Sequence, residues 1–381
     1  MGTRKLYYED CDIRTFCAQV IACEKREKGW AVTLDATAFY PEGGGQACDL
    51  GTLDDAVILY VMEEGEQVVH LCDRPLSVGK AVTGSIDWNR RFDLMQQHTG
   101  EHIVSGIMHK RYGWQNVGFH VGEQVMEVDF DGPIPAEEIA AIEQEANQAV
   151  WENIALKCWY PTPEELPNVF YRTKRALPWP VRIVQVPGYD SCACCGVHVK
   201  TTGQVGLIKI ISCVKFHQGV RMEMVCGKRA FLLMQAVFEQ NRQVSQAFSA
   251  KILETGEAAR RMNDQLSGEK YRASTLEKQL FSAIAQNYAG KGDVQVFREG
   301  LTPAAVRELA DAIAAVCGGT AAVFSEAETG CNFCLINKNG DVKPFGNALT
   351  QKFNGRGGGK PGTFQGSLQA NKADIEDFLK I

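Results

Sequence analysis

Two short motifs far apart in the chain, His98-Thr-Gly-Glu-His102 and Cys194-Cys-Gly-Val-His198, place the strongest constraint on how this sequence can fold. Residues four apart lie on one face of an α-helix, so one metal ion can take the imidazoles of both His98 and His102. Cys194 and His198 add a thiolate and a third imidazole at the same spacing. Three nitrogens and one sulfur form a tetrahedral set that suits zinc. The sequence therefore predicts a fold that joins the motifs around one Zn²⁺ per chain.

Residues beside these motifs leave two alternatives open. Cys192 and Cys195 compete with Cys194 as the thiolate ligand. Glu101 turns the first motif into His-x-x-Glu-His, the inverted zinc-peptidase motif, in which the glutamate is the general base. Such a peptidase needs a downstream acidic ligand, whereas this chain offers Cys-x-x-x-His. The remaining histidines are expected to be surface or packing residues: His70, His109, His120 and His217.

The spacing of apolar residues predicts an α+β protein in four parts. Residues 1–88 should form a β-barrel-like domain, with hairpins made by segments 15–23 and 30–34 and by segments 57–62 and 67–72. Residues 89–226 should form an α+β domain that contains zinc, with helices over 87–112 and around 139–150 and strands between 180 and 225. Residues 227–289 should form a helical connector with a break near 252–256. Residues 290–381 should form a small α/β domain.

Charge and composition restrict the partners. The formal net charge of −6 counts against a simple nucleic-acid binder, so any contact with RNA must rest on local basic patches. The 14 cysteines are scattered, which favours metal ligands or free thiols over disulfides. No apolar run approaches the roughly 18 residues that span a bilayer, and the N-terminal residues do not resemble a signal peptide. We expect a cytoplasmic protein with no membrane partner.

Two glycine-rich segments are candidate ligand contacts. Residues 39–46 read Phe-Tyr-Pro-Glu-Gly-Gly-Gly-Gln, and Gly43, Gly44 and Gly45 can expose backbone amides to a ligand. The alternative is a tight turn that leaves a β-domain. Residues 354–361 combine glycines with Arg356 and Lys360, but match neither a Walker loop nor a dinucleotide fingerprint. The alternative there is a flexible loop.

The order of these motifs resembles the editing domain of alanyl-tRNA synthetase and its freestanding relatives, the AlaX proteins. The segment from Cys194 to Gly206 is similar to the family's Cys-Gly-Gly-Thr-His-Val…Thr-Gly segment, except that Cys195 stands where the family has glycine. Residues 219–223 resemble its Gly-x-Arg-Arg-Ile-Glu run, and residues 355–367 the glycine-rich signature of the synthetase C-terminal domain. Only about a dozen residues precede the β-domain, so the expected relative is the long freestanding type, AlaX-L, rather than a synthetase.

The resemblance implies a zinc-dependent aminoacyl-tRNA deacylase that consumes no ATP and assigns residues 89–226 to editing. The implied substrate is alanine tRNA mischarged with serine, or with glycine, and serine is distinguished from alanine by groups that bind its hydroxyl. The implied partners are this tRNA and a second copy of the chain, through residues 290–381. An editing domain for threonine tRNA, a metallopeptidase and a non-catalytic zinc protein that binds RNA are the alternatives. The expected catalytic residues are Gln46, Glu101, Gly43, Gly44 and Gly45; the substrate-binding residues are Thr33, Thr37, Arg356 and Lys360; and the metal ligands are His98, His102, Cys194 and His198.

Overall fold

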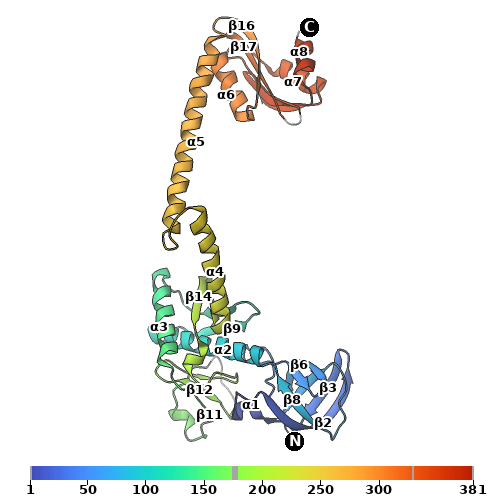
Figure 1. Ribbon diagram of the computed structural model, residues 1–381, viewed down its shortest axis with the longest axis vertical. Coiled ribbons are helices and arrows are strands. Elements are labelled where there is room, and N and C mark those ends of the chain that lie inside the picture. Colours follow the sequence, from blue (N-terminus) through green and yellow to red (C-terminus); the bar gives the residue numbers. More distant parts are fainter. Residues whose placement is uncertain (1, 174–178, 328–329, 380–381) are drawn as a thin grey trace. The chain divides into compact units, whose positions relative to one another are not determined.

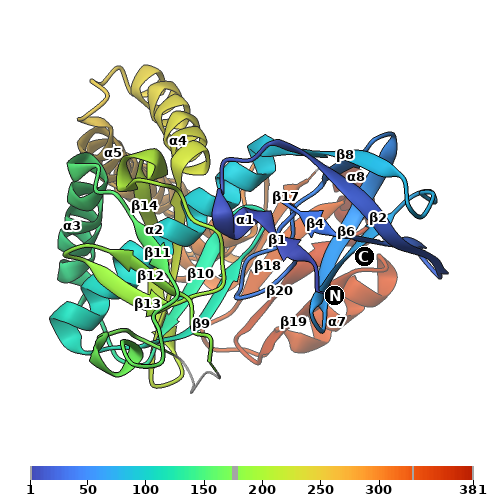
Figure 2. The same cartoon turned by 90° about the horizontal axis from the view of Figure 1, so that it is seen from below.

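The computed structural model describes residues 2–173, 179–327 and 330–379 and is a mixed α+β protein, as predicted. It divides into two compact units, Met1–Arg242 and Gln243–Ile381 (Figures 1 and 2). The boundary falls within helix α4, Gly227–Ala247, inside the segment expected to be a connector. The finer division into four parts stays a prediction. No helix in the described ranges is long and apolar enough to cross a membrane.

The first unit begins with a closed β-barrel, drawn in blue in Figure 1. Side chains of its first long strand alternate between buried and exposed positions, as expected for a strand with one face in a core. Both predicted hairpins are present, since β2 pairs with β3 and β6 with β7. The barrel strands are, in spatial order, β2 (Thr15–Arg26), β3 (Gly29–Leu34), β7 (Gln67–Cys72), β6 (Ala56–Glu64), β5 (Gly51–Leu53) and β8 (Ala81–Ile86).

His70 is a packing residue inside the barrel, as predicted, and it makes stability depend on pH. Its ring is fully buried, and it lies between the Thr37 hydroxyl at 2.8 Å and the Val32 carbonyl at 3.1 Å. Burial lowers the pKa of His70 to about 4. The neutral ring therefore contributes stability that is fully present above the unfolded pKa of ~6.5 and is lost as the pH falls toward 4.

We expect His70→Asn to reduce this pH dependence. Asparagine keeps an N–H donor but cannot take up a proton. Between pH 7 and 4.5 the natural protein should lose about 2–3 kcal/mol of unfolding free energy more than the variant does. Urea unfolding followed by circular dichroism at the two pH values measures this difference. Equal losses in the two proteins would show that the ring does not titrate in this way.

Helix α2, Trp88–Tyr112, is buried along most of its length and forms the centre of the first unit. The Asp87 side chain accepts a hydrogen bond from the Arg90 amide and caps its N-terminus, and Gly113 ends it in the left-handed conformation (φ 77°). Helix α3, Ile139–Glu152, packs against it. A four-stranded antiparallel sheet packs against this pair: β14 (Ile208–Phe216), β15 (Gly219–Cys226), β10 (Met126–Phe130) and β9 (Asn116–Val121).

A buried ion pair joins the barrel to α2. The Arg91 guanidinium donates to the Asp49 carboxylate, with Nε 2.9 Å from each carboxylate oxygen, and both side chains are fully buried. Asp49 also accepts the Tyr40 amide at 2.6 Å, while Arg91 donates to the Ala38 carbonyl at 2.5 Å. Because Ala38 and Tyr40 flank Phe39, this network fixes the start of the first glycine-rich segment against the helix.

A smaller three-stranded sheet, with its strands side by side in Figure 2, completes the first unit. It consists of β11 (Lys157–Trp159), β12 (Ile183–Val186) and β13 (Asp190–Ala193). Short elements at the N-terminus lie before the barrel: β1 (Arg4–Lys5), which pairs with β4 (Ala36–Thr37), and helix α1 (Leu6–Glu9).

The second unit contains helix α5, Thr255–Gln286, and a five-stranded sheet. Its order is β16 (Gly292–Glu299), β17 (Gly318–Glu326), β18 (Cys331–Ile336), β20 (Thr363–Leu368) and β19 (Arg356–Lys360). The first two strands are parallel and the others antiparallel. The accompanying helices are α6 (Pro303–Ala314), α7 (Lys343–Lys352) and α8 (Lys372–Leu379).

The second glycine-rich segment is an edge strand, so the flexible loop given as its alternative is wrong. Residues Arg356–Lys360 form β19 and pair with β20 in register, Gly358 opposite Gln365. A Cβ on Gly359 would lie 1.9 Å from the Thr363 carbonyl oxygen, so the close approach of the two strands requires glycine there. The sequence did not predict this strand because its glycines lack the β-branched or aromatic side chains that are typical of strands.

Candidate metal centre

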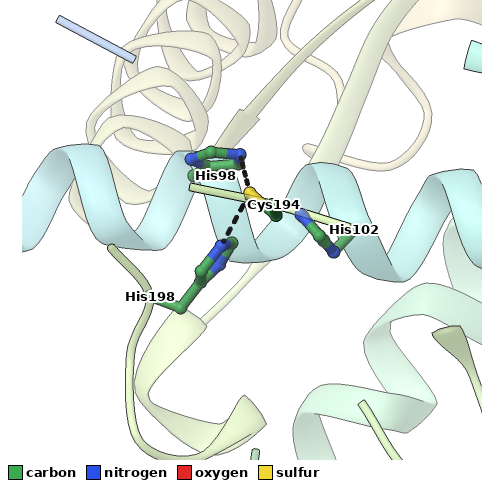
Figure 3. A group of neighbouring side chains, drawn as sticks. All are labelled: His98, His102, Cys194 and His198. Atoms are coloured by element: carbon green, nitrogen blue, oxygen red, sulfur yellow. Dashed lines mark hydrogen bonds between the residues drawn. The ribbon is translucent and has the colours of Figure 1, made fainter. Parts of the chain in front are cut away.

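The fold brings His98, His102, Cys194 and His198 together, as Figure 3 shows. The two histidines of α2 face Cys194, which follows β13 directly, and His198 in the next loop. The Cys194 Sγ lies 3.4 Å from His98 Nε2 and 3.5 Å from His198 Nε2, and all four ligating atoms lie within 4.8 Å of one another. Tetrahedral zinc with bonds of ~2.0–2.3 Å separates its ligand atoms by roughly 3.3–3.8 Å. The spacing therefore fits zinc.

Hydrogen bonds fix the His98 ring so that its Nε2 faces the other ligands. The backbone amide of Val197 donates to Gln46 Oε1 at 3.3 Å, which identifies that atom as the carboxamide oxygen. The same oxygen lies 2.8 Å from His98 Nδ1, which must then carry the proton. A neutral ring with its proton on Nδ1 has its free lone pair on Nε2, the atom nearest the thiol.

The other two imidazoles are oriented in the same way. His102 Nδ1 lies 3.0 Å from the Asp190 carboxylate, which the Arg172 guanidinium holds at 2.7 and 2.9 Å. His198 Nδ1 lies 3.2 Å from the Thr99 hydroxyl. The Nε2 atoms of the three rings thus lie on the side of Cys194, and each outer nitrogen has a partner, as is usual around bound metals.

Position favours Cys194 among the three candidate sulfur ligands, since its Sγ lies within 3.5 Å of both His98 Nε2 and His198 Nε2. The Gly196 amide also donates to its sulfur at 3.3 Å. Burial raises the pKa of Cys192 to about 11 and also raises that of Cys195. Of these three cysteines, only Cys194 belongs to the group that contains all three histidines.

Asp190 should tune metal affinity without touching the metal. Asp190→Asn removes the charge that stabilises His102 and leaves Arg172 without its ionic partner. We expect zinc affinity to fall about 10- to 100-fold, the usual loss when an outer partner of a ligand is changed. Competition with a chromogenic chelator measures this affinity, and Asp55→Asn, at an exposed position, is the matched control. Unchanged affinity in Asp190→Asn would contradict the assigned hydrogen bond.

The first glycine-rich segment lies directly beside the four ligands. Gly44 and Gly45 adopt positive φ values of 59° and 82°, and a Cβ on Gly45 would lie 2.4 Å from the Phe119 ring. Gln46 is fully buried, and its Nε2 has no hydrogen-bond partner among the residues that the structure describes. A buried, unpaired amide donor is costly in a folded protein, so this atom is a candidate contact for a ligand.

The sequence predicted that the backbone amides of Gly43, Gly44 and Gly45 can all contact a ligand. The Gly43 amide already donates to the Gln46 carbonyl at 3.1 Å, so it is not available as an oxyanion donor. The Gly44 and Gly45 amides have no hydrogen-bond partner in the described part of the chain. The structure thus leaves these two amides and Gln46 Nε2 as the donors of this loop.

Glu101 also lies at the centre, with one of its two oxygens engaged elsewhere. Its Oε1 accepts from Ser105 Oγ and from Asn116 Nδ2, the latter at 2.5 Å. Its Oε2 lies 3.9 Å from His102 Nε2. The carboxylate is buried, so Ser105 and Asn116 hold it in a fixed orientation beside the ligands. Neither of these two partners was predicted from the sequence.

Sequence comparisons find relatives among tRNA-editing proteins and tRNA synthetases. Residues 181–222 match the family described as the threonyl and alanyl tRNA synthetase second additional domain, and residues 3–90 match the class II (A) tRNA synthetases. The alanyl-tRNA editing protein Aarsd1-A of Xenopus laevis is 28% identical, with 97% of this chain and 96% of that protein aligned. The mouse protein Aarsd1 is 27% identical over 98% and 97%. The chain is related over nearly its whole length to alanyl-tRNA editing proteins.

A synthetase matches this chain over part of its length. The alanine–tRNA ligase of Ignicoccus hospitalis is 38% identical, but the alignment covers 60% of this chain and 26% of the ligase. The match at residues 181–222 contains Cys194 and His198, and that at 3–90 contains the loop with Gln46. These two family matches thus include Gln46, Cys194 and His198, while His98 and His102 lie between them.

The predicted substrate-binding residues belong to two different units. The Thr37 hydroxyl is engaged in the barrel, where it lies against His70 and accepts the Phe39 amide at 3.1 Å. Thr33 is a buried residue of β3, opposite Val69. Arg356 and Lys360 are exposed on β19 of the second unit. A role for these four residues in binding substrate stays a prediction.

Proposed function

We propose that this protein hydrolyses the ester of serine wrongly attached to alanine tRNA, with zinc held by His98, His102, Cys194 and His198. Similarity to alanyl-tRNA editing proteins supports the class, an aminoacyl-tRNA deacylase. The observation that carries the finer proposal is Gln46, which orients His98 through Oε1 and leaves Nε2 free for a substrate.

The chain's own donors would stabilise the transition state. Attack of water on an ester carbonyl places negative charge on its oxygen, and Gln46 Nε2 with the Gly44 and Gly45 amides can donate to that oxygen. Zinc bound at the four ligands supplies a positive charge beside the reacting ester. Glu101 Oε2 accepts a proton from the attacking water and returns it to the departing ribose oxygen. The products are free serine and intact tRNA.

Selection between serine and alanine requires a group that recognises the serine hydroxyl. A pocket that admits serine cannot exclude alanine by size. A buried polar group left unpaired by alanine can discriminate by roughly 10⁴-fold. Thr33 and Thr37 are the candidates, and Thr37 would exchange its bond to His70 for one to the substrate. Glycine has no hydroxyl, so its removal would need a different explanation.

The second unit is proposed to bind the body of the tRNA and to form a dimer. Arg356 and Lys360 are exposed at the two ends of an edge strand whose glycines permit close approach of a phosphate backbone. Cations gathered on one strand can attract RNA although the whole chain carries a net charge of −6. We also propose that the protein acts in the cytoplasm, with residues 227–289 as the connector.

The peptidase alternative is less well supported by the ligand set. The inverted zinc-peptidase motif requires an acidic ligand. The group of four contains none, and Asp190 has its two oxygens engaged by His102 and Arg172. A peptide substrate would also have no evident use for the second unit.

Deacylation of purified Ser-tRNA and Ala-tRNA, both made on alanine tRNA, tests the proposal. We expect rapid release of serine, with alanine released at least about 10³-fold more slowly if a hydroxyl contact operates. Casein and short peptides should remain intact. Cleavage of peptides with Ser-tRNA left intact would establish the peptidase instead. Equal release of the two amino acids would refute recognition of the hydroxyl.

A further inference from the structure

An exposed aromatic side chain lies in one row with the ligand Cys194. In the three-stranded sheet, Trp159 pairs with Ile183 and Ile183 with Ala193. One residue further along each strand, the pattern aligns Tyr160, Arg182 and Cys194, and a hydrogen bond of 3.1 Å from the Cys194 amide to the Arg182 carbonyl continues the pairing. Aligned residues share a face, and two strand spacings separate Tyr160 from Cys194 by roughly 10 Å.

Tyr160 rests on a firm support that is tied to the metal ligands. Its ring packs edge to face with Tyr8, with centroids 6.4 Å apart and planes at 75°. The Arg182 guanidinium lies 4.6 Å from the Tyr8 ring centroid and donates to the carbonyls of Cys194 and Gly196 at 2.9 and 2.8 Å. The Tyr8 hydroxyl donates to the Cys195 carbonyl at 2.6 Å. Tyr8 and Arg182 thus join the loop of ligands to Tyr160.

Tyr160 is nevertheless left open to solvent. About half of this residue, 48%, is exposed. Cys195, which accepts the Tyr8 hydroxyl, is exposed as well, and so is Gly44, which lies against the Cys195 sulfur. A rigid, half-exposed ring beside a guanidinium has the composition of sites that stack single-stranded nucleic-acid bases.

We propose that Tyr160, supported by Tyr8 and Arg182, stacks the terminal adenine of the tRNA. This inference rests on the proposed function, because the ester to be cleaved is on the ribose of that nucleotide. With the ester at the metal centre, a serine side chain is too short to reach across roughly 10 Å. The base on the same ribose extends in that range. Arg182 adds a positive charge where the phosphates of the 3′ end approach.

A binding cycle between Tyr160 and the terminal adenosine tests the inference. The probes are uncharged alanine tRNA with a complete CCA end and the same tRNA without its last nucleotide. The proteins are the full chain, Tyr160→Ala, Tyr160→Phe and, as an exposed aromatic control on α3, Trp151→Ala. Zinc content is measured in each, to show that the centre is intact.

Tyr160→Ala should weaken binding of the complete tRNA about 5- to 150-fold, the effect of losing one stacked base. Tyr160→Phe and Trp151→Ala should bind as the natural chain does. The shortened tRNA should bind the natural chain with this same loss and should show no further loss with Tyr160→Ala. Equal effects of Tyr160→Ala on the two tRNAs, or no effect, would overturn the inference.

A second readout separates this inference from the proposed function. Serine release from Ser-tRNA by the natural chain tests deacylation itself, whatever the outcome at Tyr160. In Tyr160→Ala, the KM for Ser-tRNA should rise with little change in kcat, and the phenylalanine variant should restore it. A loss of kcat that phenylalanine does not restore would indicate a structural role and contradict stacking.

Discussion

Replacing His102 or His198 with alanine should release the metal and abolish deacylation. Each of the three histidines offers its Nε2 to the metal, while its Nδ1 is held by a hydrogen bond. No remaining histidine of the centre can therefore supply a second ligand atom in place of a lost ring. Changing only an outer partner costs about 10- to 100-fold in metal affinity, and loss of a ligand should cost more than this. Zinc analysis of the purified variants should find far less than one ion per chain.

The matched control for these variants is His217→Asn. His217 lies in the turn between β14 and β15 with a φ of 51°, a conformation that asparagine tolerates. This variant should keep its zinc and its rate of serine release. If His102→Ala and His198→Ala retained one zinc per chain and full activity, the assignment of the four ligands would be wrong.

Gln46→Glu should slow deacylation about 10²- to 10³-fold, the usual cost of removing one donor to an oxyanion. Glutamate keeps an oxygen acceptor for His98 Nδ1 and the Val197 amide but replaces the free Nε2 donor with a second oxygen. The variant should therefore retain its zinc while kcat falls. Single-turnover release of serine from Ser-tRNA, with zinc content measured in parallel, gives both quantities.

Gln240→Glu is the control, because Gln240 is exposed on α4 and the change in charge is the same. A rate for Gln46→Glu close to that of this control would exclude Gln46 Nε2 as a donor in the reaction. If Gln46→Glu lost its zinc as well as its rate of serine release, the role of Gln46 would be only to orient His98.

Local periodicity was enough to predict the elements that carry the ligands. Helix α2 has an aspartate cap, a glycine end and apolar residues at steps of three and four, so its span and the shared face of His98 and His102 follow from the sequence. The charged turns between β2 and β3 and between β6 and β7 gave the hairpins in the same way.

The contacts that orient the ligands come from tertiary structure and leave no local signal. Asp190 reaches His102 from another segment and is itself held by Arg172, and Tyr8 reaches the ligand loop from the N-terminus. Nothing in the spacing of these residues distinguishes them from ordinary polar and aromatic residues. Strand β19 was not predicted because its local signal is misleading. Its glycines favour a loop, whereas pairing with β20 imposes a strand.

The most direct test of the central claim is a zinc titration of the metal-free protein, with the initial rate of serine release from Ser-tRNA on alanine tRNA as the readout. The rate should be near zero without metal and rise in proportion to added zinc. It should level off at about one equivalent per chain, since one centre holds one ion. A metal-free protein that releases serine as fast as the zinc-loaded one would contradict the assignment of this centre to the reaction.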